Sequence, residues 1–104
     1  MKDLFSVSGK TVLVTGGSRG IGEMIAAGFL ANGAKVYLSA RKADRCIATA
    51  DRLAREHGGQ CVALPADLSQ VEGLNALAAA LAAREARLDV LVNNAGASWG
   101  ARLG

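Results

Sequence analysis

Short apolar runs alternate with longer segments of helical periodicity along this 104-residue chain. Four of the runs are rich in Val, Leu and Tyr and are predicted to be strands buried on both faces, over residues 11–14, 35–38, 61–64 and 89–92. Between them, apolar residues recur at helical spacing over residues 21–29, 43–57 and 71–81. The pattern therefore predicts four strands joined by three helices.

Local signals agree with these boundaries. Asn32-Gly33 is expected to end the first helix and Gly58-Gly59 the second, while Ser69 is expected to be the N-cap of the third. Strands joined by crossover helices form a parallel sheet with right-handed connections, so the favoured fold is an open α/β sheet of the doubly wound kind. We expect residues 1–104 to belong to one domain, because the chain has no repeat and no linker-like segment.

Composition and charge narrow the location of the protein and the kinds of partner that it can bind. The chain is 51% hydrophobic with a single proline, as expected for one compact unit. No window approaches the roughly 18 apolar residues of a membrane span, and the N-terminus lacks a secretory core, so we expect a cytoplasmic protein without membrane contact. The net charge of +3 is spread over the chain, which argues against nucleic acid and fits a small anion better.

A glycine cluster stands between the first predicted strand and the first helix, where free backbone N–H groups and the helix dipole favour a negative charge. Gly16 can adopt a conformation closed to other residues, Gly20 can let a phosphate approach the backbone, and Gly22 can let the helix pack tightly on the sheet. This context predicts a pyrophosphate-binding loop. The alternative is a tight turn that binds nothing.

The end of the second strand indicates which dinucleotide would bind. Proteins that use NAD usually place an acid there to bind the ribose 2′-hydroxyl, but Ala40 occupies this position and Arg41 follows it. Together with Arg19 of the glycine loop, Arg41 could bind a 2′-phosphate, so NADP(H) is the predicted cofactor. The alternative is a pair of exposed surface arginines.

Three motifs, 15–22 (TGGSRGIG), 66–69 (ADLS) and 93–96 (NNAG), give the sequence a clear family resemblance. In this order and at these intervals they resemble the short-chain dehydrogenase/reductase family, and within it the bacterial 3-oxoacyl reductases, including the branch associated with rhamnolipid synthesis. The resemblance covers nearly the whole chain. It implies a Rossmann-like sheet of which this chain forms the N-terminal β-α-β-α-β-α-β portion, apparently truncated.

The resemblance also assigns residues to the cofactor. It implies that Asp67 bonds the adenine amino group and that Leu68 lies against the ring, while Asn93, Ala95 and Gly96 pass behind the adenosine ribose. Ser18 and Ile21 join the contacts as members of the glycine motif. The alternative for Asn93 is that its side chain caps the fourth strand through bonds to the backbone, and the two roles are compatible.

The resemblance implies hydride transfer between nicotinamide and a small-molecule carbonyl or hydroxyl substrate, with a 3-oxoacyl thioester as one candidate. The family carries out this reaction with a Ser, a Tyr and a Lys four residues after the Tyr. In this chain Tyr37 is the single tyrosine and Arg41 stands four residues later, so the catalytic residues are expected beyond Gly104 of a homo-oligomeric parent protein. The alternatives are a non-catalytic dinucleotide-binding module and a truncated product that does not fold.

Other titratable groups are interpreted as surface residues. His57 is expected at an exposed helix end, and no cluster with metal-ligand spacing is present in the sequence. The glutamates expected on solvated helix faces are Glu23, Glu56, Glu72 and Glu85. Residues 90–92 are expected to form an apolar edge strand, because the sheet would continue past the fourth strand in a longer protein.

Overall fold

The computed structural model describes residues 6–16 and 20–94. Seven elements alternate between strand and helix, as the sequence predicts. The strands are β1 (Thr11–Thr15), β2 (Lys35–Ser39), β3 (Cys61–Ala63) and β4 (Val90–Asn93), and the helices are α1 (Gly20–Ala31), α2 (Ala43–His57) and α3 (Val71–Arg84). Within the described residues, no helix is both long and apolar enough to cross a membrane.

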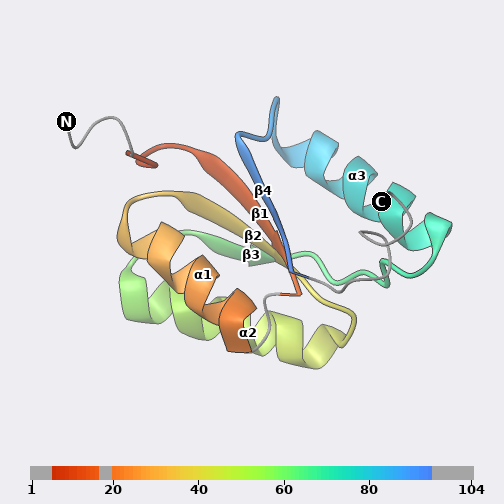
Figure 1. Cartoon of the computed structure of the whole chain (residues 1–104), viewed down its shortest axis with the longest axis horizontal. Coiled ribbons are helices and arrows are strands. Elements are labelled where there is room, and N and C mark those ends of the chain that lie inside the picture. Colours follow the sequence, from red (N-terminus) through yellow and green to blue (C-terminus); the bar gives the residue numbers. More distant parts are fainter. Residues whose placement is uncertain (1–5, 17–19, 95–104) are drawn as a thin grey trace.

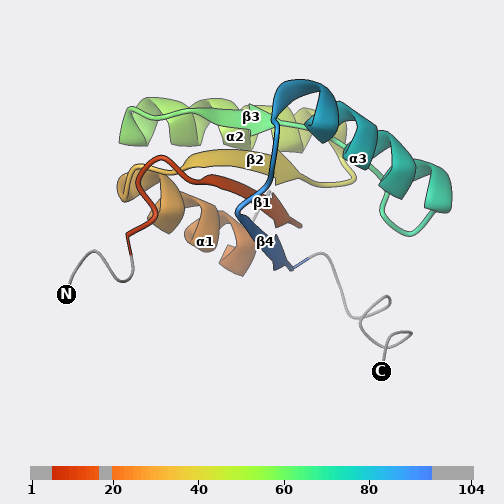
Figure 2. The ribbon, with the colours of Figure 1, turned by 90° about the horizontal axis from the view of Figure 1, so that it is seen from above.

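The strands form one parallel sheet in the order β3-β2-β1-β4, with β1 paired to β2 on one side and to β4 on the other. Helices α1 and α2 cover one face and α3 lies over the opposite face (Figures 1 and 2). The first two connections each lead outward to the next strand, whereas the β3-to-β4 connection returns past β2 and β1. Because crossovers between parallel strands are right-handed, this reversal places α3 on the opposite face. The doubly wound fold is therefore confirmed, with its reversal of strand order between β1 and β4.

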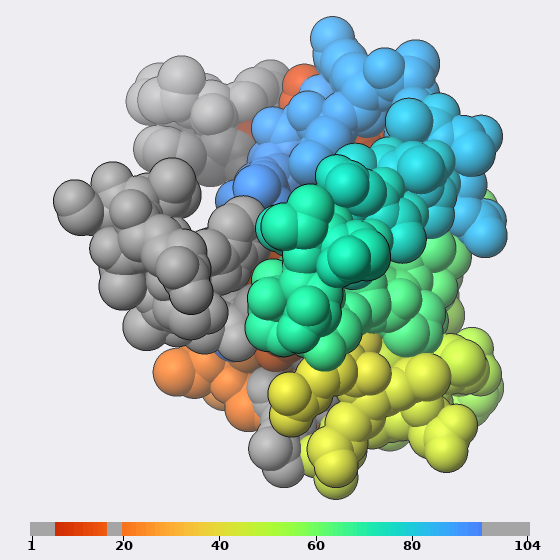
Figure 3. Space-filling model, turned by 90° about the vertical axis from the view of Figure 1, so that its right-hand side faces the viewer, coloured from red at the N-terminus to blue at the C-terminus, as the bar shows by residue number. Residues whose placement is uncertain are grey.

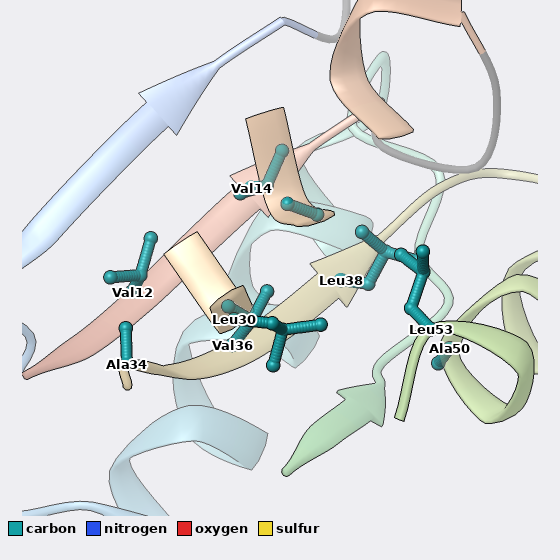
Figure 4. Packing of buried hydrophobic residues seen from close by; sticks show 9 residues of the cluster. Val12, Val14, Leu30, Ala34, Val36, Leu38, Ala50 and Leu53 are labelled. Atoms are coloured by element: carbon teal, nitrogen blue, oxygen red, sulfur yellow. The ribbon is translucent and has the colours of Figure 1, made fainter. Parts of the chain in front are cut away.

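The main core lies between the sheet and the pair α1 and α2 (Figure 4). Alternate strand residues point into it, because successive side chains of a strand face opposite ways. Its buried members are Val12, Val14, Ala26, Leu30, Ala34, Val36, Leu38, Ala50 and Leu53. A smaller cluster on the other face consists of Leu13, Tyr37, Leu64 and Leu77, with partly buried residues packed around it, and holds α3 against the sheet.

The packing corrects three expectations. β1 and β2 are buried on both faces, but β3 and β4 are half-exposed because they form the two edges of the sheet. In α1, the residues facing the sheet include small ones, and Met24 is 71% exposed although it lies on the predicted apolar stripe. The N-cap of α3 is Gln70, not Ser69, because the Ser69 hydroxyl donates instead to Asp67 Oδ1, 2.6 Å away.

A cluster of charged and polar side chains joins the end of α3 to the sheet. Glu85 belongs to this cluster, so the prediction that it lies on a solvated helix face is wrong. Glu85 follows the last residue of α3, and its Oε2 accepts from the Tyr37 hydroxyl at 2.6 Å and pairs with Lys35 Nζ at 2.5 Å. These contacts, with Lys35 first, hold the pKa of Glu85 below its ordinary value. Nearby, Asp89 Oδ2 accepts from the backbone N–H of Thr11 at 2.8 Å.

The substitution Glu85→Gln should remove a pH-dependent part of the stability. Because folding lowers the pKa of Glu85, its charge stabilises the fold above about pH 4 to 5, and this contribution is lost as the pH falls through the folded-state pKa. In urea denaturation, the wild type should be more stable than the variant at neutral pH, and the two should converge in acid. Glu72→Gln, an exposed site on α3, is the control; a difference for Glu85→Gln that is independent of pH would contradict this assignment.

Candidate functional site

The carboxyl ends of all four strands meet at one rim of the sheet, because every pairing is parallel. Three backbone hydrogen bonds continue the pairing into the loops: Gly16 N to Ser39 O at 2.6 Å, Asn94 N to Thr15 O at 3.1 Å and Ala66 N to Ala40 O at 3.1 Å. Figure 3 views the molecule from this side, with the start of α2 (yellow) below the start of α3 (green). These bonds fix Gly16, Ala66 and Asn94, which follow three of the strands, to the neighbouring chain segment.

Gly16 and Gly20, at the two ends of the glycine motif's first part, both have a positive φ. Gly16 follows β1 with φ of 70°, a left-handed conformation that other residues rarely adopt. Gly20, the first residue of α1, has φ of 63°, and a Cβ added there would meet no described atom within 4 Å. Gly22 is buried, as expected for a helix packed closely on its strand. The bare surface at Gly20 and the adjacent start of α1 fit a phosphate group.

The end of β2 presents positive charge beside a helix N-terminus. Ala40 is buried, whereas Arg41 and Lys42 are exposed. Lys42 is the N-cap of α2 and makes no side-chain capping bond, so the first amides of α2 are left to solvent or to a ligand. The site can therefore bind an anion with a helix dipole and two cationic side chains. The sequence predicts a binding role for Arg41, whereas the position of Lys42 at the N-cap emerges from the fold.

Asp67 heads a tight turn between β3 and α3. Its Oδ1 accepts from the Ser69 hydroxyl at 2.6 Å and from the Ser69 N–H at 3.1 Å, and these bonds, aided by the charge of Arg41, lower the pKa of Asp67. Leu68 is half-buried and packs on the cluster beneath α3. Asp67 is thus an ionised acceptor at the rim, held in place by its own turn.

Thr15 links β1 to the end of β4, a role that the sequence analysis missed. It is only 1% exposed, and its hydroxyl lies 3.1 Å from Asn93 Oδ1 and accepts from Asn94 N–H at 3.1 Å. The signal that could have indicated this role is the position of Thr15 at the end of β1. In the parallel register this residue stands opposite Asn93. The hydroxyl therefore orients the Asn93 side chain at the reversal point of the sheet.

Eight of the predicted residues lie along this rim or in the first turn of α1. They are Gly16, Gly20, Ile21, Gly22, Arg41, Asp67, Leu68 and Asn93. Ile21 is 66% exposed at the start of α1 and so is accessible to a ligand. The predictions for Ser18, Arg19, Ala95 and Gly96 lie outside the described residues.

The fold also places two other titratable side chains, Tyr37 and His57. The Tyr37 hydroxyl is committed to Glu85, and burial first, then this bond, raises the pKa of Tyr37. His57 is exposed at the last residue of α2, as predicted. Residues 6–16 and 20–94 contain no group of three or more His, Cys, Asp or Glu side chains that could hold a metal ion.

The fold and the rim define a doubly wound α/β protein in which glycines at positive φ stand between β1 and α1, at the carboxyl end of the sheet. The chain belongs to the short chain dehydrogenase family, whose model matches residues 10–103. This finding confirms the family resemblance of the motifs.

One curated relative and two solved structures illustrate the similarity. The rhamnolipids biosynthesis 3-oxoacyl-(acyl-carrier-protein) reductase of Pseudomonas aeruginosa is 56% identical over 103 residues, which are 99% of this chain and 40% of that protein. The structure of the Pseudomonas aeruginosa RhlG/NADP active-site complex matches with a TM-score of 0.86 and 51% identity, over 98% of this chain and 42% of that one. L-sorbose reductase of Gluconobacter frateurii, complexed with NADPH and L-sorbose, matches with a TM-score of 0.84 and 37% identity, over 88% and 35%.

The substitution Thr15→Val should destabilise the fold by about 1 to 2 kcal/mol, because it removes a buried hydroxyl from the Asn93 and Asn94 contacts while keeping the side-chain shape. Thr15→Ser, which keeps the hydroxyl, is the matched control and should recover most of the loss. The free energy of unfolding from urea titration measures both variants. A Thr15→Val variant as stable as the wild type would show that the hydroxyl bonds contribute nothing.

Proposed function

We propose that this chain is the cofactor-binding portion of an NADP(H)-dependent oxidoreductase. The single observation that carries the proposal is the combination, on one rim, of Gly16 and Gly20, both at positive φ, with exposed Arg41, which directly follows the position where NAD-binding proteins usually have an acid. The similar RhlG and L-sorbose reductase structures, described as complexes with NADP and NADPH, support it. The cofactor, when bound, would supply the hydride.

The residues of this chain would bind and orient that cofactor. The glycine loop and the start of α1 would hold the pyrophosphate, with Ser18 and Ile21 beside it. Arg41, with Arg19, would bind the 2′-phosphate, Asp67 and Leu68 the adenine, and Asn93, Ala95 and Gly96 the ribose. Asp67 is suited to this role, because its lowered pKa keeps it an acceptor for the adenine amino group.

We further propose that the intact protein reduces a carbonyl compound, with a 3-oxoacyl thioester as the first candidate substrate. The support is the 56% identity to a 3-oxoacyl reductase. The chain spans 40% of the length of that relative, so we propose that later residues supply the catalytic Ser, Tyr and Lys and the contacts of a homo-oligomer in the cytoplasm. The half-exposed β4, with Leu91 52% exposed, is consistent with a sheet that continues there.

A non-catalytic dinucleotide-binding module is the alternative, since Tyr37 is the only tyrosine of the chain and is bonded to Glu85. The full-length protein distinguishes the two. With NADPH and a 3-oxoacyl thioester, the reductase hypothesis expects NADPH oxidation that depends on the thioester. Tight NADPH binding without turnover of any carbonyl substrate would favour the binding module.

The double substitution Arg19→Ala and Arg41→Ala should weaken NADPH binding at least about tenfold and leave NADH binding nearly unchanged. Each charge-assisted contact to the 2′-phosphate contributes roughly 1.5 to 3 kcal/mol, and about 1.4 kcal/mol corresponds to a factor of ten. Calorimetric titration of both nucleotides measures the effect. Arg55→Ala, in the last turn of α2, is the control. Equal losses for NADPH and NADH would remove the 2′-phosphate assignment.

The substitution Gly20→Ala should weaken NADPH binding by about tenfold or more, because the methyl group would occupy the space where a phosphate approaches. Gly9→Ala is a matched control: Gly9 also has positive φ, 77°, and also has no described atom within 4 Å of an added Cβ, but it precedes β1 at the opposite end of the sheet. Both variants carry similar backbone strain, so similar losses of stability are expected. Similar losses of NADPH affinity would argue against the loop assignment.

A further inference from the structure

Gly73 lies in the first turn of α3, although glycine is among the poorest helix formers. The structure gives a reason for its presence. A Cβ added at this position would overlap the backbone carbonyl oxygen of Asp67 and would lie 2.7 Å from its carbonyl carbon and 3.3 Å from its nitrogen. Since carbon atoms in contact are about 3.5 to 4.0 Å apart, the two segments would have to separate by about 1 Å. The obstacle is backbone, which cannot rotate aside as a side chain can.

Hydrogen bonds on both sides of the Asp67 turn restrict its movement away from such a methyl group. On its strand side, the Ala66 N–H donates to Ala40 O at 3.1 Å, next to Arg41. On its helix side, the Gln70 N–H reaches the Asp67 carbonyl at 3.3 Å, and both Ser69 donors hold the Asp67 carboxylate. The turn is therefore held between β2 and α3. Gly73 is the residue of α3 that leaves room for the Asp67 carbonyl group.

We propose that Gly73 is a positioning residue for the cofactor: by allowing the Asp67 carbonyl to rest on α3, it sets the location of the Asp67 carboxylate at the rim. This inference rests on the proposed function, in which Asp67 binds the adenine. In this proposal Gly73 acts through Asp67 and does not contact the cofactor itself. Its effect is confined to the adenine half of the site, because the glycine loop follows β1 and is separated from this turn by β2.

The test is the substitution Gly73→Ala in the full-length protein. Alanine favours the helix but displaces the Asp67 turn, so the affinities for NADPH and for adenosine 2′,5′-bisphosphate should both fall about tenfold to a hundredfold. The kcat at saturating NADPH should stay within about twofold of wild type, because the nicotinamide half is untouched. The matched control is Gly28→Ala, a helical glycine of α1 where an added Cβ meets nothing within 4 Å.

The outcomes separate this inference from the function on which it rests. Wild-type binding of NADPH with unchanged affinity in Gly73→Ala would overturn the role of Gly73 alone, as would a fall in kcat without a fall in nucleotide affinity. Failure of the wild type to bind NADPH would overturn the proposed function and this inference with it.

If Gly73→Ala does not fold, hydrogen exchange on the wild type decides the matter. The Leu74 amide bonds to Gln70 O at 3.1 Å and reports on the first turn of α3. Adenosine 2′,5′-bisphosphate should slow exchange from Ser69 through Leu74, because the turn and the helix move as one unit. Protection that stops at Ser69 would overturn the proposal.

Discussion

The parallel pairing of β1 with both β2 and β4 is the constraint on which the rest of the structure depends. It aligns the ends of the strands, so that Thr15 stands opposite Ser39 on one side and Asn93 on the other. A slip of one residue would turn Val12 and Val14 away from the main core, because side chains alternate between the faces. The core that α1 and α2 cover therefore also fixes which residues reach the rim, and packing and site geometry have one cause.

The two ends of the sheet are built differently, and the difference fits the proposed function. At the amino end, side chains close the structure: Glu85 joins the end of α3 to Lys35 and Tyr37, and Asp89 caps the start of β1. At the carboxyl end, the side chains of Thr15 and Asp67 make local hydrogen bonds, whereas those of Arg41 and Lys42 remain exposed. Charges that are already paired stabilise the fold, whereas those left in solvent remain available to a ligand.

The sequence predicts most of this fold and those parts of the site that depend on local conformation. Strand and helix order follow from periodicity, and Gly16 from its place after a strand. The errors concern long-range contacts: Glu85 looks like a helix-surface residue until the fold brings it to Tyr37, and Ser69 looks like a cap until its hydroxyl binds Asp67. Thr15 and Gly73 were missed for the same reason, because their roles depend on partners that only the folded chain places beside them.

The charges at the rim must be balanced for a 2′-phosphate to bind there. Asp67 is ionised and close enough to Arg41 for the arginine to help lower its pKa, so a phosphate beside Arg41 would also feel the repulsion of Asp67. The Ser69 hydroxyl and amide reduce this conflict, because both donate to the carboxylate and spread part of its charge into the turn. In the proposed complex, the position of the Asp67 turn would therefore affect both halves of the adenosine 2′-phosphate: the adenine through hydrogen bonding and the phosphate through electrostatics. A glycine that sets this position, as we infer for Gly73, would tune cofactor preference without contacting the cofactor.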